Sequence, residues 1–310
     1  MLHDINLAEL RKGSRVTDED VSNTLSEHMS RASISLPDAV VAITGGARGI
    51  GRDTAARFAA AGARVALGDI DGDAAASAAA SIGAPAQPFR VDVRTRDSFA
   101  DFIASVEATI GPIDVLVNNA GVMPAGPFLQ EPETTTDLVL AVNLHGPIHG
   151  MRLVLPGMIE RGRGHVVNVA SMVGRVELAG LATYSASKHA LVGLTSAVRA
   201  ELHGTGVTLT TVLPGVVDTE LSSGFAVPLA RLLRVGPQDV AEAIVASIHD
   251  RPHELAVPGW MGLVPYLRPW VPAPLETLLR RLLGGDSAMR PAGDARSAYA
   301  ERLARQAAGD

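Results

Sequence analysis

The sequence predicts an α/β protein, built as a single domain around a doubly wound parallel sheet, and three observations support this prediction. Seven short apolar runs alternate with Ala-rich helical stretches between residues 37 and 258. The runs are apolar throughout instead of alternating with polar residues, which is typical of strands covered by helices on both faces. No linker rich in Pro, Gly or Ser divides residues 37–254, which favours one domain over two stacked halves.

Each expected strand is a short apolar run between helical stretches. In chain order the strands are Val40–Thr44, Arg64–Asp69, Pro88–Val93, Ile113–Asn118, His165–Ala170, Val207–Leu213 and Leu255–Pro258. Because crossovers between parallel strands are right-handed, this alternation places helices on both faces of the sheet.

Segments of different composition flank the predicted domain. Residues 1–36 are polar and lack a strong hydrophobic period, so we expect a poorly packed N-terminal extension with one short helix around Val16–Met29. Residues 259–310 form an apolar C-terminal tail that contains both tryptophans. Leucines at the spacing of one helical face predict a short helix in this tail; they are Leu275, Leu278, Leu279, Leu282 and Leu283.

The composition excludes several classes of function. The net charge is −6 at pH 7, so no overall basic field favours nucleic acid as a partner. The chain has no cysteine, which excludes thiolate metal sites and a cysteine nucleophile, and its histidines lack metal-ligand spacing, so no metal is expected. No apolar run approaches the roughly 18 residues of a membrane span, and the N-terminus lacks the core of a signal peptide, so we expect a soluble, cytoplasmic protein.

A glycine-rich turn connects the first expected strand to the helical stretch after it. Gly45, Gly49 and Gly51 allow the backbone to turn tightly and to approach a diphosphate, and the helix start offers N–H groups and a positive dipole end. Such a turn alone is also compatible with an ordinary strand–helix connection. The acidic Asp69, which ends the second strand 18 residues after Gly51, favours dinucleotide binding.

The spacing Gly-x3-Gly-x-Gly resembles the short-chain dehydrogenase/reductase family, whose members have the Rossmann fold. Further segments match family motifs in order; they are Asn118-Asn119-Ala120-Gly121, Ser171, the Tyr-x3-Lys motif of Tyr184 and Lys188, and Pro214-Gly215 with Thr219. Asn143 lies at the position of the fourth catalytic residue of the family. The resemblance covers residues 40–219 and implies an oxidoreductase that interconverts a secondary alcohol and a ketone.

The resemblance implies a role for each of the four catalytic residues. Tyr184 is expected to act as the acid/base, and Ser171 to hydrogen-bond the substrate oxygen. Free tyrosine has a pKa of about 10, and Lys188, on the same helical face, is expected to lower that pKa through its charge. The family also assigns Lys188 to the ribose hydroxyls of the cofactor, and Asn143 to a water relay behind the lysine.

The expected cofactor is NAD. Asp69 suits the two ribose hydroxyls of NAD and repels the 2′-phosphate of NADP, whereas Arg48 in the glycine turn points mildly toward NADP. We interpret Arg48 as a solvated loop arginine. The residues expected to bind the cofactor are Gly45, Arg48, Gly49, Ile50, Gly51, Asp69, Ile70, Asp92, Val93, Asn119, Ala120, Gly121, Tyr184, Lys188, Pro214, Gly215, Val217 and Thr219.

Four alternatives stay open. The first is an NADPH-dependent carbonyl reductase, and the second is a non-catalytic cofactor-binding protein, which the complete catalytic set disfavours. The third is an epimerase or dehydratase of the extended branch, whose first turn usually has the spacing Gly-x2-Gly-x2-Gly. The fourth is a membrane-surface protein that acts through its tail. The resemblance also implies a homo-oligomer, with a homotetramer expected, associating through the helices that carry Asn143 and Tyr184.

Two apolar segments are expected to shape the substrate pocket. The family places the segment after the sixth strand, here about Leu221–Arg234, over the substrate. The second segment, Trp260–Trp270 of the tail, must bury its apolar surface at the pocket rim, against a neighbouring subunit or at a membrane surface. The side chains concerned are Leu221, Phe225, Val227, Leu229, Leu232, Leu233, Trp260, Met261, Leu263, Val264, Tyr266, Leu267 and Trp270. If the tail forms a lid, the substrate is bulky and apolar, such as a steroid, a terpenoid or a long-chain alcohol.

Overall fold

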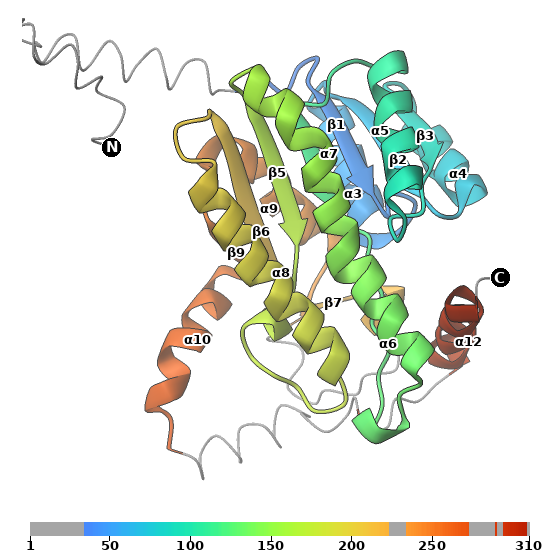
Figure 1. Cartoon of the computed structure of the whole chain (residues 1–310), viewed down its shortest axis with the longest axis vertical. Coiled ribbons are helices and arrows are strands. Elements are labelled where there is room, and N and C mark those ends of the chain that lie inside the picture. Colours follow the sequence, from blue (N-terminus) through green and yellow to red (C-terminus); the bar gives the residue numbers. More distant parts are fainter. Residues whose placement is uncertain (1–33, 223–233, 273–288, 290–293, 309–310) are drawn as a thin grey trace, which may run out of the picture.

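The strands form a parallel sheet whose order reverses near its centre. The computed structural model in Figure 1 describes residues 34–222, 234–272, 289 and 294–308. Seven strands pair in the order β3-β2-β1-β4-β5-β6-β9, and all of these pairs are parallel. The chain moves outward in one direction from β1 and in the other from β4, which leaves a switch point between them. The predicted doubly wound fold is therefore confirmed.

All seven predicted strands are present. They are β1 (Val40–Thr44), β2 (Arg64–Asp69), β3 (Ala86–Arg90), β4 (Val115–Asn118), β5 (Gly164–Val169), β6 (Val207–Pro214) and β9 (Glu254–Val257). The first two have the predicted bounds. A two-stranded ribbon, β7 (Val216–Val217) with β8 (Arg234–Val235), adds to the prediction.

The third strand departs most from its prediction. β3 ends at Arg90, so Val91 and Val93 lie in the following loop, although both side chains are buried in the core. Buried apolar loop residues give the same sequence pattern as a strand, which explains the wrong boundary. β3 is also an edge strand without a fully buried side chain, so the expectation of coverage on both faces is wrong for it.

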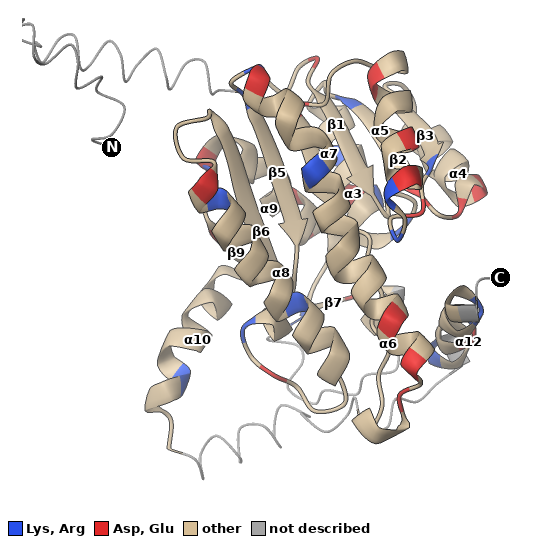
Figure 2. Ribbon diagram, in the orientation of Figure 1, with Lys and Arg blue, Asp and Glu red and all other residues tan. Residues whose placement is uncertain are grey.

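Helices cover both faces of the sheet (Figure 1). One core layer is formed with α3 (Gly49–Ala60), α4 (Gly72–Ile82) and α9 (Pro237–Asp250). The opposite layer involves α5 (Arg96–Thr109), α7 (Gly146–Glu160) and α8 (Ala182–Glu201). Figure 2 shows that charged residues lie mainly on helices and loops, which is consistent with a sheet buried between two helical layers.

A long helical run crosses the second of these layers. α6 (Glu133–Leu140) continues through a π-helical segment (Ala141–His145) into α7. Within the described ranges, this run of 28 residues is the stretch long and apolar enough by composition to span a membrane, and half of its most apolar window is buried inside the protein. Its buried side chains, including Val139 and Val154, belong to the main core cluster. We therefore assign the run to the core of the domain.

The flanking segments depart from expectation where the structure describes them. Ile34 and Leu36 are buried in the core layer of α3 and α9, so packing begins before residue 37. The helix expected around Val16–Met29 and the leucines between 275 and 283 lie outside the described residues. Near the C-terminus a helix, α12 (Asp294–Ala308), packs on the domain, and no sequence pattern singled it out.

The apolar stretch of the tail is buried only in part. It forms short helical turns at Gly259–Leu263 and Arg268–Trp270 on either side of α10 (Val264–Leu267). Met261 is buried, whereas Leu263, Tyr266, Leu267 and Trp270 are 60–86% exposed in the single chain. Within one copy of the protein the outer side of this stretch is therefore not covered, and its burial against a neighbouring subunit or a membrane surface stays a prediction.

His165 on β5 makes stability depend on pH. Burial, with a smaller contribution from the Arg251 charge, lowers the pKa of its imidazole from 6.5 to about 3. Between these values the unfolded chain binds a proton that the folded protein does not, so the free energy of unfolding falls as pH decreases through this window. We expect this residue to contribute a loss of up to about 1.4 kcal/mol per pH unit.

Urea unfolding between pH 7 and pH 4 checks this expectation. The stability difference between wild type and His165→Gln should shrink as pH falls, because glutamine removes the titrating group. His203→Gln, at an exposed position, is the matched control. A difference that stays constant across the pH range would contradict the prediction.

Candidate active site

The glycine-rich turn between β1 and α3 is fastened to the end of β4. The side-chain amide of Asn119 donates to the backbone carbonyls of Thr44 and Gly45, both at 3.0 Å. Thr44 Oγ1 in turn accepts from the Asn119 N–H at 3.1 Å. A Cβ atom at Gly51 would lie 2.1 Å from the Gly45 carbonyl oxygen, so this approach of the helix to the turn requires glycine.

The start of α3 fits a phosphate group. Its N-cap residue, Arg48, makes no side-chain hydrogen bond to the helix, and the first turn contains no acidic residue. The N–H groups and the dipole of such a helix start stabilise an anion. A Cβ atom at Gly49 would lie 3.2 Å from Thr219 Cγ2, so the loop after β6 faces the same turn. These residues fit the diphosphate of a dinucleotide.

Two carboxylates lie at and after the end of β2. Asp69 accepts hydrogen bonds from the backbone N–H groups of Ala47 and Asp71, each at 3.1 Å, which fixes its carboxylate beside the glycine turn. Arg48 donates to Asp71 at 2.6 Å. The side chain of Arg48 is 54% exposed, so it is solvated as expected, but it also has an acidic partner.

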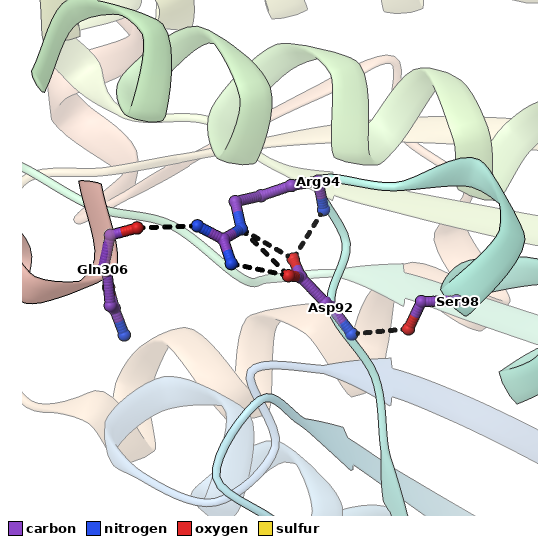
Figure 3. A network of polar contacts seen from close by, with 4 residues as sticks. All are labelled: Asp92, Arg94, Ser98 and Gln306. Carbon is purple, nitrogen blue, oxygen red and sulfur yellow. Dashed lines mark hydrogen bonds and ion pairs between the residues drawn. The ribbon is translucent and has the colours of Figure 1, made fainter. Parts of the chain in front are cut away.

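Asp92 and Arg94, in the loop after β3, form a polar network with Ser98 and Gln306 (Figure 3). Arg94 donates to the Asp92 carboxylate through Nε and Nη2 at 2.7–2.9 Å. Burial raises the pKa of Asp92, but the hydrogen bonds from Arg94 outweigh this effect and hold the pKa below its ordinary value. The Asp92 carboxylate is therefore ionised and engaged by Arg94.

Ser171, Tyr184 and Lys188 come from two neighbouring elements. Ser171 follows β5 and caps a short helical turn by accepting from the Val173 N–H at 3.3 Å. Tyr184 and Lys188 are one turn apart near the start of α8. Lys188 Nζ donates to the Val169 carbonyl at 2.8 Å and lies 5.7 Å from the centre of the Tyr184 ring.

Burial dominates the electrostatics of the tyrosine–lysine pair. It raises the pKa of Tyr184, and a hydrogen bond from Ser171 opposes that rise only in part. Burial also lowers the pKa of the Lys188 ammonium to about 8. The expectation that Lys188 lowers the pKa of Tyr184 below that of free tyrosine is therefore wrong for this structure, because desolvation of the buried phenol is the largest effect and raises its pKa.

Asn143 connects the loop after β4 to α8. It lies fully buried in the π-helical segment, a type of distortion frequent at functional sites. Its Nδ2 donates to the Val122 carbonyl at 2.9 Å and to Ser187 Oγ at 3.1 Å, and its Oδ1 accepts from the Val122 N–H at 2.9 Å. A Cβ atom at Gly121 would lie 3.4 Å from Asn143 Oδ1 and 3.7 Å from Lys188 Nζ. Asn143 thus supports the backbone next to the lysine.

A cavity of about 910 Å³ brings the predicted residues together. Its lining includes all predicted cofactor-binding residues except Gly51, together with Ser171, Tyr184 and Lys188. Gly51 and Asn143 are buried and do not line the cavity. We call the glycine-rich turn together with the start of α3 the phosphate cradle. One space, large enough for a cofactor and a substrate, therefore contains this cradle, Asp69 and the tyrosine–lysine pair.

The tail contributes to this cavity in two places. Trp260, Met261 and Val264 line it, as expected for a pocket rim. Four residues of α12 that no sequence motif indicated also line it; they are Tyr299, Arg302, Leu303 and Gln306. The spacing of Tyr299 and Leu303, four residues apart, places both on one helical face and is the one signal in the sequence that indicates this buried face.

One cavity combines the phosphate cradle, an acidic residue at the end of β2 and a buried tyrosine–lysine pair. This combination defines a dinucleotide-dependent oxidoreductase. The family model "short chain dehydrogenase" matches residues 39–226. The chain belongs to the short-chain dehydrogenase/reductase family of NAD(P)-dependent oxidoreductases.

Several known proteins are similar to the chain. It is 38% identical over 253 residues to the "Probable oxidoreductase EphD" of Mycobacterium tuberculosis, across 73% of this chain and 43% of that protein, so it spans less than half the length of this relative. It is 35% identical to "2-(S)-hydroxypropyl-CoM dehydrogenase 3" of Xanthobacter autotrophicus, across 70% of this chain and 91% of the relative. The crystal structure of the 3-ketoacyl-(acyl-carrier-protein) reductase of Brucella melitensis complexed with NADH has a TM-score of 0.68 at 28% identity, across 72% of this chain and 98% of that chain.

Proposed function

We propose that the protein is an NAD-dependent oxidoreductase that interconverts a secondary alcohol and a ketone, with Tyr184 as the acid/base. One observation carries the proposal: Ser171, Tyr184 and Lys188 line the same cavity as the start of α3 and Asp69. A cofactor held by the cradle and a substrate held by the tyrosine would therefore occupy one continuous space.

Tyr184 would exchange a proton with the substrate oxygen. Burial keeps its phenol neutral near pH 7, which suits proton donation to the carbonyl oxygen of a ketone. In alcohol oxidation the phenol must first lose its proton, and the Lys188 cation favours the resulting phenolate. Ser171 would hydrogen-bond the substrate oxygen as charge develops on it. When bound, NAD supplies the hydride chemistry.

Lys188 and Asn143 would act behind the tyrosine. With a pKa of about 8, Lys188 is mostly charged at pH 7 and loses its charge as pH rises above 8. Its bond to the Val169 carbonyl holds Nζ in the cavity wall, where it would meet the ribose hydroxyls of the cofactor. Asn143 would anchor a water relay behind Lys188, in line with the family resemblance.

We propose NAD in preference to NADP. The Asp69 carboxylate, at the end of β2 in the cavity wall, would meet the adenosine ribose of a dinucleotide and would repel a 2′-phosphate. The pairing of Arg48 with Asp71 weakens the case for Arg48 as a phosphate ligand. An NADPH-dependent carbonyl reductase, which Arg48 favours, is the second candidate.

The proposed substrate is bulky and apolar. Side chains of aliphatic and methionine type line much of the cavity; they include Met123, Leu138, Val142, Met172, Val173, Val176, Leu178, Leu181, Met261 and Val264. Such a wall offers little hydrogen bonding to a sugar or a hydroxy acid. The expected cover after β6 contributes Leu221 to the lining, and its residues 223–233 lie outside the described part of the chain.

We further propose a soluble, cytoplasmic homotetramer that associates through the helices that carry Asn143 and Tyr184, which are the continuous run of α6 and α7 and the helix α8. Ala186, Ala190 and Gly193 are exposed at helical spacing on α8, which allows a second helix to approach closely. Contact of the exposed tail residues Tyr266 and Trp270 with a membrane surface is a second candidate for that face. Co-sedimentation with lipid vesicles that is equal for wild type and Trp270→Ala would exclude it.

Tyr184→Phe tests the catalytic proposal. Removal of the proposed acid/base should lower turnover of bulky secondary alcohols with NAD by about 10²–10⁴-fold, followed by NADH absorbance. NADH affinity, followed by its fluorescence, should stay near that of wild type. Tyr266→Phe, at an exposed tyrosine, is the matched control. Wild-type turnover in Tyr184→Phe would disprove the role.

Asp69→Ala tests the cofactor proposal. Wild type should have a higher kcat/KM with NAD than with NADP, and the substitution should reduce this ratio by about tenfold or more, because it removes a repulsive charge. Asp73→Ala removes an exposed carboxylate from the first turn of α4 and should leave the ratio unchanged. A wild-type preference for NADP would contradict the assignment.

Light scattering tests the proposed assembly. Wild type should have about four times the chain mass of 32.2 kDa at micromolar concentration. Ala190→Arg should give smaller species, because a long charged side chain prevents close packing at α8. A wild-type mass near 32 kDa would rule out the oligomer.

A further inference from the structure

α12 lies over the carboxyl edge of the sheet, where the cavity opens. It packs against α6 and the short helix Glu220–Ser222, and Figure 1 shows it beside α6 at the end of the sheet to which the strand arrowheads point. Tyr299 and Leu303 are its buried apolar side chains and join the main core cluster. α12 is therefore packed against the domain and forms one wall of the cavity.

Arg296 and Tyr299 fasten the first half of α12 to two loops. The Arg296 guanidinium donates to the backbone carbonyls of Leu221 and Met123, both at 2.8 Å, and only 5% of the residue is exposed. The Tyr299 hydroxyl accepts from the Met123 N–H at 2.9 Å. α12 thus links the loop after β4 to the loop after β6.

Arg94 fastens the other end of the helix. Its Nη1 donates to the Gln306 carbonyl at 2.7 Å while its remaining donors hold Asp92 (Figure 3). A cation is favourable at this position, because carbonyl groups at the C-terminal end of a helix carry partial negative charge. The helix consequently runs from the loops after β4 and β6 to the loop after β3.

Arg302 lies between these anchors and faces the cavity. It lines the cavity together with Gly49 and Ile50 of the phosphate cradle. Its guanidinium packs over the Tyr299 ring at 5.3 Å, and Arg296 packs over the same ring at 5.0 Å, so the aromatic ring orients both arginines.

The charge of Arg302 also acts on Asp71, which pairs with Arg48 of the glycine turn. A backbone hydrogen bond from Ala74 lowers the pKa of Asp71, and the charges of Arg48 and Arg302 lower it further. Arg302 therefore acts on the group that pairs with the N-cap residue of α3. This places a positive charge of α12 near Asp71 and its partner Arg48, although α12 and the loop after β2 are far apart in sequence.

We propose that Arg302 is a binding residue for the diphosphate of the dinucleotide, and that α12 is a fixed wall that holds this guanidinium toward the cradle. The inference rests on the proposed function, since it concerns the same cofactor site. The start of α3 supplies N–H groups from one wall, and Arg302 supplies a full positive charge from another. A guanidinium is well suited to phosphate oxygens because it offers several N–H donors in one plane.

Fluorescence titration of the full-length protein with NADH and with NADPH tests the inference. Arg302→Gln should weaken the binding of both nucleotides by about tenfold, because both carry the diphosphate, and should reduce the salt dependence of binding. Arg302→Lys, which keeps the charge, should recover most of the affinity. Arg305→Gln, at an exposed arginine on the same helix, is the matched control and should bind like wild type.

The outcomes separate the two proposals. Absence of nucleotide binding in wild type would overturn the proposed function itself. Binding in wild type with equal affinities for Arg302→Gln and Arg305→Gln would overturn the role of Arg302 alone, and so would a loss confined to NADPH, which would indicate a 2′-phosphate contact. Thermal unfolding without nucleotide checks the fold of each variant. If Arg302→Gln is destabilised, Arg302→Met, which keeps an apolar stem over Tyr299, replaces it and must show the same loss.

Discussion

The contact between the turn after β1 and the end of β4 determines the geometry of the site. Asn119 holds the carbonyls of Thr44 and Gly45, and the missing side chain at Gly51 lets α3 start directly behind them. The start of α3 is thereby aimed into the cavity at the switch point of the sheet. The same loop continues to Val122, whose backbone is bound by Asn143, and Asn143 reaches Ser187 on α8. A continuous set of hydrogen bonds thus relates the phosphate cradle to the helix that carries the tyrosine and the lysine.

Desolvation sets the resting state of the catalytic pair. In water a tyrosine and a lysine both titrate near pH 10, but burial moves their pKa values in opposite directions, each toward its neutral form. The pair therefore rests with a firmly neutral phenol next to an ammonium that is only moderately basic. Hydrogen bonds to the phenolate or to the ammonium from groups entering the cavity would reverse part of this burial effect. The protonation states of Tyr184 and Lys188 therefore depend on whether a ligand occupies the cavity.

The sequence alone predicted the sheet and most of the cavity lining, because both depend on local spacing. Strands such as β1 and β2 are short apolar runs between helices, and the glycine, Asn-Asn-Ala-Gly and Tyr-x3-Lys motifs have fixed places at the strand ends. The loop after β3 was assigned to the strand because Val91 and Val93 are buried without pairing in the sheet. No extended sequence pattern indicated α12, because its buried apolar side chains are few, such as Tyr299 and Leu303, and the hydrogen bonds of Tyr299 and Arg296 reach loops distant in sequence. The raised pKa of Tyr184 depends on burial of the phenol, which the Tyr-x3-Lys spacing does not encode.

The anchors of α12 also bear on the order in which the molecule assembles and opens. Tyr299 meets Met123 across 176 residues, and Gln306 meets Arg94 across 212. Contacts of such separation close very large loops, and strand pairing in the sheet does not involve α12, so the sheet does not depend on this helix for its pairing. An element held by few anchors undergoes local unfolding at lower free energy than the central strands. Local opening of α12 would break the hydrogen bond from the Met123 N–H to Tyr299, so the exchange of this amide proton would report on that event.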